Sequence, residues 1–231
     1  MTFWKLALVG AAASLALGGA AFAQEEAASE ASFTFNAGVA SDYVFRGVSQ
    51  TDGPQVFGGV DFSNGPIYAG AWLSNVDFGD DTDAEIDLYV GVKPELGPVT
   101  LDLAYIYYGY VGEPTGADYA YSEFKVAASV PAGPVTIGTA WYYSPEFFGG
   151  TGEALYGEVN ASYAINDKWS VGGAVGSQDV DIGGQYTTWN IGVGWAPLDK
   201  LALDLRYHDS DLDCGDICDS RVVLTLKTTL P

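Results

Sequence analysis

Apolar and polar residues alternate along most of this chain of 231 residues. In the segment 84–93, for example, Ala84, Ile86 and Leu88 alternate with Glu85 and Asp87. Successive side chains of a β-strand point to opposite faces, so a period of two over about ten residues indicates a strand with one apolar and one polar face. The pattern therefore predicts an all-β fold.

Turns that contain Gly and Pro separate the alternating segments, as at Gly65-Pro66, Gly97-Pro98 and Gly133-Pro134. These residues supply the backbone angles that a chain reversal requires. The alternation predicts about twelve strands, at residues 32–47, 54–62, 66–77, 84–93, 98–110, 119–130, 134–143, 153–164, 168–177, 185–195, 200–208 and 220–230.

Short turns alternate with looser acidic connections, at 79–83, 112–118, 144–152, 178–184 and 209–220. Short turns at one end and longer loops at the other are typical of outer-membrane barrels, and strands of about ten residues match a tilted crossing of the bilayer. We therefore predict a single antiparallel transmembrane β-barrel with short periplasmic turns and longer acidic extracellular loops. The alternative is an exported soluble β-domain.

Aromatic residues on the apolar face gather near the predicted strand ends. Tyr107 and Tyr143 lie beside the long loops, and Tyr163, Trp169 and Trp195 lie beside the short turns. Aromatic girdles of this kind sit at the level of the lipid headgroups.

The first 23 residues read as a cleaved signal peptide. Lys5 precedes an apolar run, and small residues end it at Ala21-Phe22-Ala23, which is an A-x-A cleavage pattern. The barrel domain is then expected at residues 24–231. Beyond this segment, no run approaches the roughly 18 apolar residues that a spanning helix needs.

Acidic residues far outnumber basic ones, 30 against 9, and the formal net charge is −21. Such a balance argues against nucleic acid as a partner, because phosphates would repel the chain. It suits cationic partners or a site that attracts cations.

Charged residues on the polar face are the expected lining of the barrel interior. Arg46 lies within the apolar stretch Tyr43-Val44-Phe45, where lipid would penalise it by a few kcal/mol. It is either a structural ion pair that fixes the first strand or a charge at a constriction that selects solutes. The full predicted lining set is Asp42, Arg46, Glu85, Asp87, Asp102, Glu123, Lys125, Glu158, Asp204, Arg206 and Arg221.

The loop 208–220 combines two cysteines with several aspartates. A disulfide between Cys214 and Cys218 is expected in an exported chain. A Ca²⁺ or Mg²⁺ site is a weaker expectation that involves Asp209, Asp211, Asp213 and Asp216. The order of these residues departs from an EF-hand, and a solvated acidic loop is the simpler interpretation.

Catalytic constellations are not evident. The single histidine, His208, has no G-x-S-x-G nucleophile elbow to accompany it. Tyr108, Tyr110, Tyr119 and Tyr121 fall on the polar face near the outer mouth, where they would either stack on a ligand ring or fill a narrow barrel. We expect no enzyme activity.

The stretches DYVFRGVSQ, YAGAWLSNVDF, AEIDLYVGVK and LAYIYYGY resemble the TorF-type porins, a bacterial outer-membrane family of uncharacterised function (Gcw_chp). The resemblance spans the mature chain and implies a barrel and a pore, without catalytic residues or a known substrate.

The expected function is passive diffusion of small hydrophilic solutes, with a bias toward cations. The alternative is a plugged structural or adhesion barrel whose acidic loops are bridged by divalent cations. The expected partners are outer-membrane lipid, lipopolysaccharide and the barrel assembly machinery.

Overall fold

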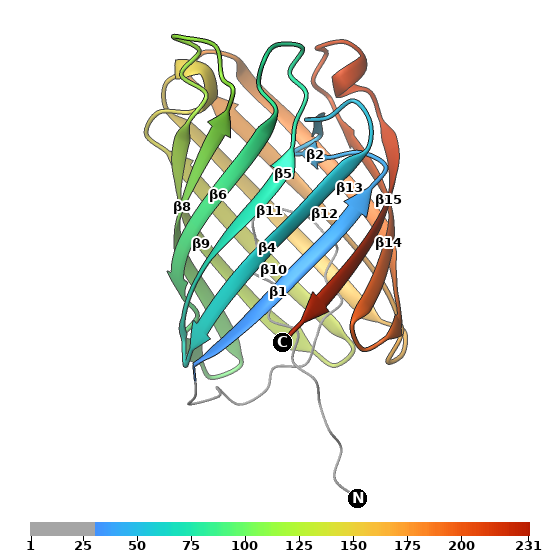
Figure 1. Cartoon of the computed structure of the whole chain (residues 1–231). Helices are drawn as coiled ribbons and strands as arrows, with labels where there is room; N and C mark the ends of the chain where they lie inside the picture. Colours follow the sequence, from blue (N-terminus) through green and yellow to red (C-terminus); the bar gives the residue numbers. More distant parts are fainter. Residues whose placement is uncertain (1–30) are drawn as a thin grey trace, which may run out of the picture.

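The chain folds into a closed antiparallel barrel of twelve strands (Figure 1), in a computed structural model that describes residues 31–231. The barrel closes where β1 (Ser32–Ala40) pairs with β15 on one side and β4 on the other. The other wall strands are β4 (Gln55–Asn64), β5 (Ile67–Asn75), β6 (Ala84–Val92), β8 (Val99–Val111), β9 (Tyr121–Ala132), β10 (Val135–Ser144), β11 (Ala154–Ala164), β12 (Trp169–Val180), β13 (Gly184–Leu198), β14 (Leu201–Ser210) and β15 (Arg221–Leu230). The predicted all-β fold is confirmed, whereas the predicted signal peptide at residues 1–23 lies outside the described residues.

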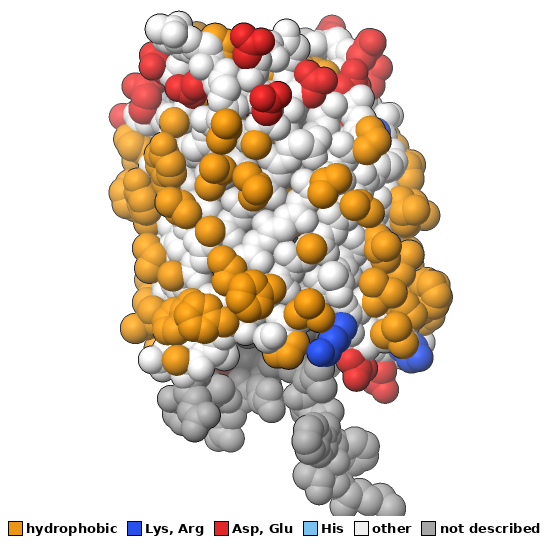
Figure 2. Space-filling model, viewed as in Figure 1, with side chains coloured by type: hydrophobic (Ala, Val, Ile, Leu, Met, Phe, Trp, Pro, Cys, Tyr) orange, Lys and Arg blue, Asp and Glu red, His pale blue; other side chains and the backbone are white. Residues whose placement is uncertain are grey.

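The apolar face of the wall points outward. Val126, Val159 and Ile191 are exposed on three different strands, and Figure 2 shows apolar side chains over the visible side of the barrel. Their polar neighbours in sequence point inward, which is the opposite of a soluble protein and the arrangement that a hydrocarbon environment favours. Within residues 31–231, no helix has the length and apolar character to cross a membrane.

The two ends of the barrel differ. β1 begins and β15 ends at the short-turn end (Figure 1). Asp and Glu side chains gather at the opposite, long-loop end (Figure 2). One predicted loop is wrong, because β12 continues to Val180 and β13 begins at Gly184. The expected loop 178–184 is therefore a tight turn, and Gln178 belongs to the wall.

The first predicted strand, 32–47, is also wrong beyond Ala40. The wall strand ends there, and the chain turns into a small hairpin of β2 (Val44–Phe45) and β3 (Val48–Ser49). Arg46 and Gly47 form its tip with φ of 47° and 82°. Positive φ at both central residues is the geometry of a type I′ turn, the favoured two-residue connection of hairpins. We call residues 42–51 the inner hairpin.

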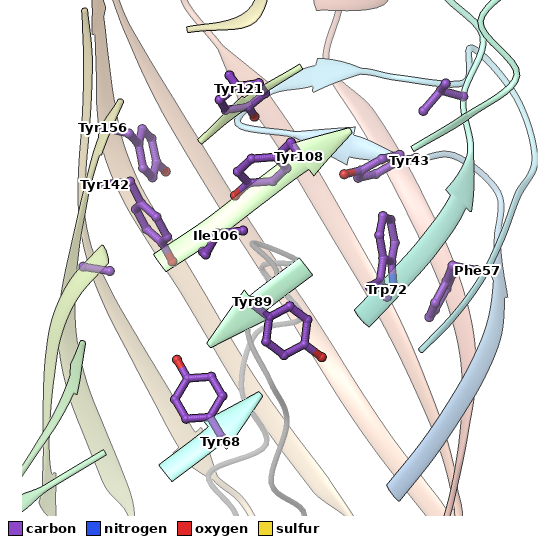
Figure 3. Close-up of a cluster of buried hydrophobic side chains, with 12 residues drawn as sticks. Tyr43, Phe57, Tyr68, Trp72, Tyr89, Ile106, Tyr108, Tyr121, Tyr142 and Tyr156 are labelled. Atoms are coloured by element: carbon purple, nitrogen blue, oxygen red, sulfur yellow. The ribbon is translucent and has the colours of Figure 1, made fainter. Parts of the chain in front are cut away.

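Aromatic side chains fill much of the interior. They come from β4 to β11 and include Tyr68, Trp72, Tyr89, Tyr142 and Tyr156, which Figure 3 shows directed into the barrel.

The tyrosines near the mouth pack against other rings. Tyr108 stacks on Tyr121, and Tyr119 stacks on Phe148 of the short 3-10 helix η1 (Phe148–Gly150), both with ring centroids 4.4 Å apart. These rings contact one another as space-filling groups, which matches the second of the two interpretations of these tyrosines.

Candidate functional site

The inner hairpin crosses the barrel interior. It leaves the wall between β1 and β4, and its tip contacts side chains of β9 to β12 on the opposite side. Figure 1 shows β2 inside the outline of the barrel, near the long-loop end. The tip lies close to the wall, because a Cβ added at Gly47 would lie 2.8 Å from Ser210 Cβ.

Arg46 anchors the hairpin tip. Its two terminal nitrogens donate to the two carboxylate oxygens of Glu123, at 2.8 and 2.9 Å, and Nη1 also donates to Gln178 Oε1 at 2.9 Å. The guanidinium carbon lies 4.3 Å from the ring centroid of Tyr156 and 5.0 Å from that of Tyr142. A bidentate carboxylate and aromatic faces are the groups that bind guanidinium best.

Asp42 holds the base of the hairpin. It accepts hydrogen bonds from Ser49 Oγ at 2.6 Å and Thr51 Oγ1 at 3.0 Å. It also forms an ion pair with Arg221 at the start of β15. The base and the tip are thus attached to different sides of the wall, which fixes the hairpin across the interior.

Tyr43 belongs to the interior, although strict alternation along the predicted first strand, 32–47, would place it on the same apolar face as Phe33 and Phe35. Only 4 % of its surface is exposed, and its hydroxyl donates to Glu85 Oε1 at 2.6 Å. The prediction failed because residues 41–47 do not continue the strand, so the alternation of faces stops at Ala40.

Asp87 lies on β6 next to Glu85 and has no partner. Its side chain is buried, and neither carboxylate oxygen has a hydrogen-bond donor. In the strand register it stands between Trp72 of β5 and Tyr108 of β8. A buried carboxylate without a donor is costly, and such groups in native proteins have a specific cause.

A second charged group lies toward the short-turn end. Asp102 of β8 accepts from Lys125 Nζ at 2.8 Å and from the Tyr68 hydroxyl at 2.6 Å, and Lys93 lies 3.8 Å away. This carboxylate is fully satisfied by its neighbours, in contrast to Asp87.

The remaining predicted lining residues form two local groups. Asp204 and Arg206 pair with each other along β14, and Arg206 also donates to Asn190 Oδ1 at 2.6 Å. Glu158 accepts from Asn160 and Tyr156 on its own strand. The structure thus brings Arg46, Glu123 and Gln178 together and leaves the β14 pair apart from them.

The loop after β14 contains the short 3-10 helix η2 (Asp216–Cys218). Cys214 and Cys218 lie at disulfide distance, with Cα atoms 5.5 Å apart, as predicted. Asp209 accepts from Tyr207, and Asp211 accepts from the backbone of Thr187. Across residues 31–231, no group of three or more His, Cys, Asp and Glu is placed to hold a metal ion, so the structure adds no support for a site that includes Asp213 and Asp216.

Three residues of the Arg46 site were missed in the sequence. Gln178 was assigned to a loop, and Tyr142 and Tyr156 are ordinary members of alternating strands. The pattern contained one partial signal, Gly47 between Val44-Phe45 and Val48-Ser49, although Arg-Gly is not one of the favoured pairs of a two-residue hairpin. The wall partners could not be found, because they depend on how far the hairpin reaches across the barrel.

Solved structures with a similar fold are outer-membrane porins and channels. The KdgM porin in complex with disordered oligogalacturonate aligns with a TM-score of 0.63 at 4% identity, over 86% of this chain and 99% of that chain. The NanC porin aligns at 0.57 and 11% identity, over 87% and 100%. The COG4313 outer membrane channel from Pseudomonas putida F1 aligns at 0.55 and 8% identity, over 89% and 97%. At these identities the similarity shows the fold alone.

A search of curated protein sequences finds no match to this chain. The model of one sequence family matches residues 24–229, nearly the whole chain, and its description reads "Bacterial protein of unknown function (Gcw_chp)". The family part of the sequence resemblance is therefore confirmed, while its TorF-type label stays a prediction. The chain belongs to the Gcw_chp family, and its fold is that of an outer-membrane porin.

Proposed function

We propose that this protein is a porin-like channel of the bacterial outer membrane, through which small hydrophilic solutes diffuse passively. The inner hairpin carries the proposal, because it places a chain segment with a charged tip inside a barrel of porin fold. The width and charge of such a constriction determine which solutes pass. The porin fold also favours a channel over an enzyme.

Cations are the favoured solutes in this proposal. The chain carries a net charge of −21, and acidic side chains gather at the long-loop end (Figure 2). A negative mouth raises the local concentration of cations and lowers that of anions. The KdgM porin was solved with oligogalacturonate, a polyanion. Repulsion from the acidic long-loop end disfavours a polyanion here.

The proposed location follows from the same features. The outward apolar face fits the hydrocarbon core of the outer membrane, and Trp169 and Trp195 stack on one another at the short-turn end, at the depth expected for headgroups. The long-loop end would then face lipopolysaccharide, and the barrel assembly machinery would insert the chain.

A second candidate function is a closed structural barrel at the cell surface. It is favoured by the same hairpin together with the buried rings of Tyr108, Tyr121 and Tyr142, which occupy the interior from several sides. In this case the hairpin is a permanent plug rather than a constriction.

Single-channel recording separates the two candidates. The refolded mature protein is placed in a planar bilayer under a KCl gradient, after heat-modifiable gel mobility has shown that the barrel is folded. Unit current steps with a cation-selective reversal potential are expected. Folded protein without steps would contradict the channel and support the closed barrel.

A further inference from the structure

The guanidinium of Arg46 occupies a complete recognition site. Glu123 supplies both carboxylate oxygens, Gln178 supplies its amide oxygen, and the rings of Tyr142 and Tyr156 lie 5.0 and 4.3 Å from the guanidinium carbon. We call these four residues the cage. Shape and charge make the cage selective for a planar cation over a spherical one, because only the planar fork fills both carboxylate bonds at once.

The cage and its occupant belong to separable parts of the molecule. All four cage residues stand on wall strands, β9 to β12, which pair with each other in continuous ladders. Arg46 stands on the tip of the inner hairpin, whose two strands pair only over Val44–Ser49 and Phe45–Val48. Arg46 also adopts φ of 47°, which an L-residue other than Gly or Asn rarely adopts. The wall would keep the cage in place if the hairpin moved.

The cage lies beside further buried carboxyl groups. Arg46 pairs with Glu123, but Asp87 is 1 % exposed with both oxygens unpartnered, and it lies close enough to Glu85 and Glu123 for repulsion. Asp87 is therefore an acceptor without a donor beside the cage. Tyr108 supports the arrangement by donating to Glu123 Oε2 at 3.0 Å.

We propose that the cage is a binding site for solutes that carry a guanidinium group, and that such a solute replaces Arg46 and releases the hairpin tip. This inference rests on the proposed channel, for which it names a solute class. The hairpin tethers Arg46 next to the cage, so a free solute competes with an effective concentration in the millimolar range or above. Binding to the intact protein is therefore weak, and removal of the Arg46 side chain should strengthen it.

The test compares arginine amide with citrulline amide, which has nearly the same shape and lacks the guanidinium charge. Isothermal titration calorimetry measures binding of each ligand to refolded wild type, to Arg46→Ala, and to Arg46→Ala combined with Glu123→Gln. We expect arginine amide to bind Arg46→Ala at least about tenfold more tightly than wild type, or about 1.4 kcal/mol. The Glu123→Gln change should abolish this gain, and citrulline amide should bind none of the three proteins.

Equal binding of both amides to Arg46→Ala, or an unchanged affinity after Glu123→Gln, would overturn the proposal that the cage binds guanidinium solutes. Arg46→Met, which keeps an unbranched apolar stem without the guanidinium group, replaces Arg46→Ala if the latter fails the heat-modifiability test for folding. Planar-bilayer current is recorded in parallel with the same ligands. Arginine amide that binds Arg46→Ala while neither protein conducts would refute the channel and retain the cage.

Discussion

Two carboxyl groups of the interior, a half-buried one at Asp102 and a buried one at Asp87, differ in what surrounds them. Asp102 receives hydrogen bonds from Lys125 and Tyr68, whereas Asp87 receives none. A satisfied buried carboxylate stabilises its surroundings, and an unsatisfied one costs free energy. The two residues thus provide a matched pair, in which one carboxyl group is expected to stabilise the fold and the other is not.

Neutralising these two carboxylates should have opposite effects on the free energy of unfolding. Asp87→Asn should leave it unchanged or raise it by up to about 1 kcal/mol, because this carboxyl group has no hydrogen-bond donor to lose. Asp102→Asn should lower it by about 1–3 kcal/mol, because Lys125 and Tyr68 lose a charged acceptor. Urea titration of both variants in lipid vesicles measures the difference. Equal losses in the two variants would contradict this assignment.

At the scale of elements, the inner hairpin depends on the backbone of its tip. Gly47 has φ of 82°, and a Cβ there would lie 2.8 Å from Ser210 Cβ. Gly53 is a natural control in the same connection, because its φ is not positive and its nearest neighbour to an added Cβ is Thr51 O at 3.7 Å.

Gly47→Ala should loosen the hairpin without disturbing the wall. An L-residue in this conformation costs about 1–2 kcal/mol, which corresponds to a fall of about 5–30-fold in amide protection of residues 42–51. Hydrogen–deuterium exchange with mass spectrometry measures this fall in amide protection. Gly53→Ala should stay within about 0.5 kcal/mol of wild type. If Gly47→Ala keeps full protection, the tip geometry described here is wrong.

The loop that bears the disulfide packs against the same hairpin. Its η2 helix contacts β3, and Arg221, which follows the loop, pairs with Asp42 at the hairpin base. A closed ring of this size contributes about 2 kcal/mol at most through loop entropy. Replacing both Cys214 and Cys218 by Ser should therefore raise exchange in residues 211–220 while the wall strands keep their protection. Unchanged exchange in the loop would show that the disulfide does not stiffen it.

Alternation predicted the wall strands well because lipid favours apolar side chains on one face of each strand, while the interior accepts polar side chains on the other face. It failed at Tyr43 and Phe45, which are apolar but face the interior of the barrel instead of lipid. A period of two carries no information on which apolar surface a residue meets. The partners of Arg46 were also beyond prediction, since Glu123 and Gln178 are separated from it by 77 and 132 residues.

For the whole molecule, the account requires that the outer face of the wall contacts lipid. Val159 lies in the middle of β11 and is 61 % exposed, while Ile182 is similarly exposed in the turn after β12. Both are apolar, but only Val159 lies at the depth of the hydrocarbon core.

Arginine substitutions at these two positions should lower the free energy of unfolding by different amounts, because only Val159 faces the hydrocarbon core. Val159→Arg should reduce the free energy of unfolding by about 2–4 kcal/mol, and Ile182→Arg by no more than about 1 kcal/mol. Urea unfolding in vesicles checks both values. A Val159→Arg variant as stable as wild type would be inconsistent with a lipid-facing β11.

The most direct test of the account compares the conductance of two barrels. Ala40 and Gln55 are paired in the β1–β4 register, so a short Gly-Ser turn can replace residues 41–54 without changing the wall. We predict that this variant, once shown to be folded by heat-modifiable mobility, gives unit conductance at least about threefold above wild type, because the constriction is removed. Equal conductance in the two proteins would contradict the claim that the inner hairpin constricts the channel.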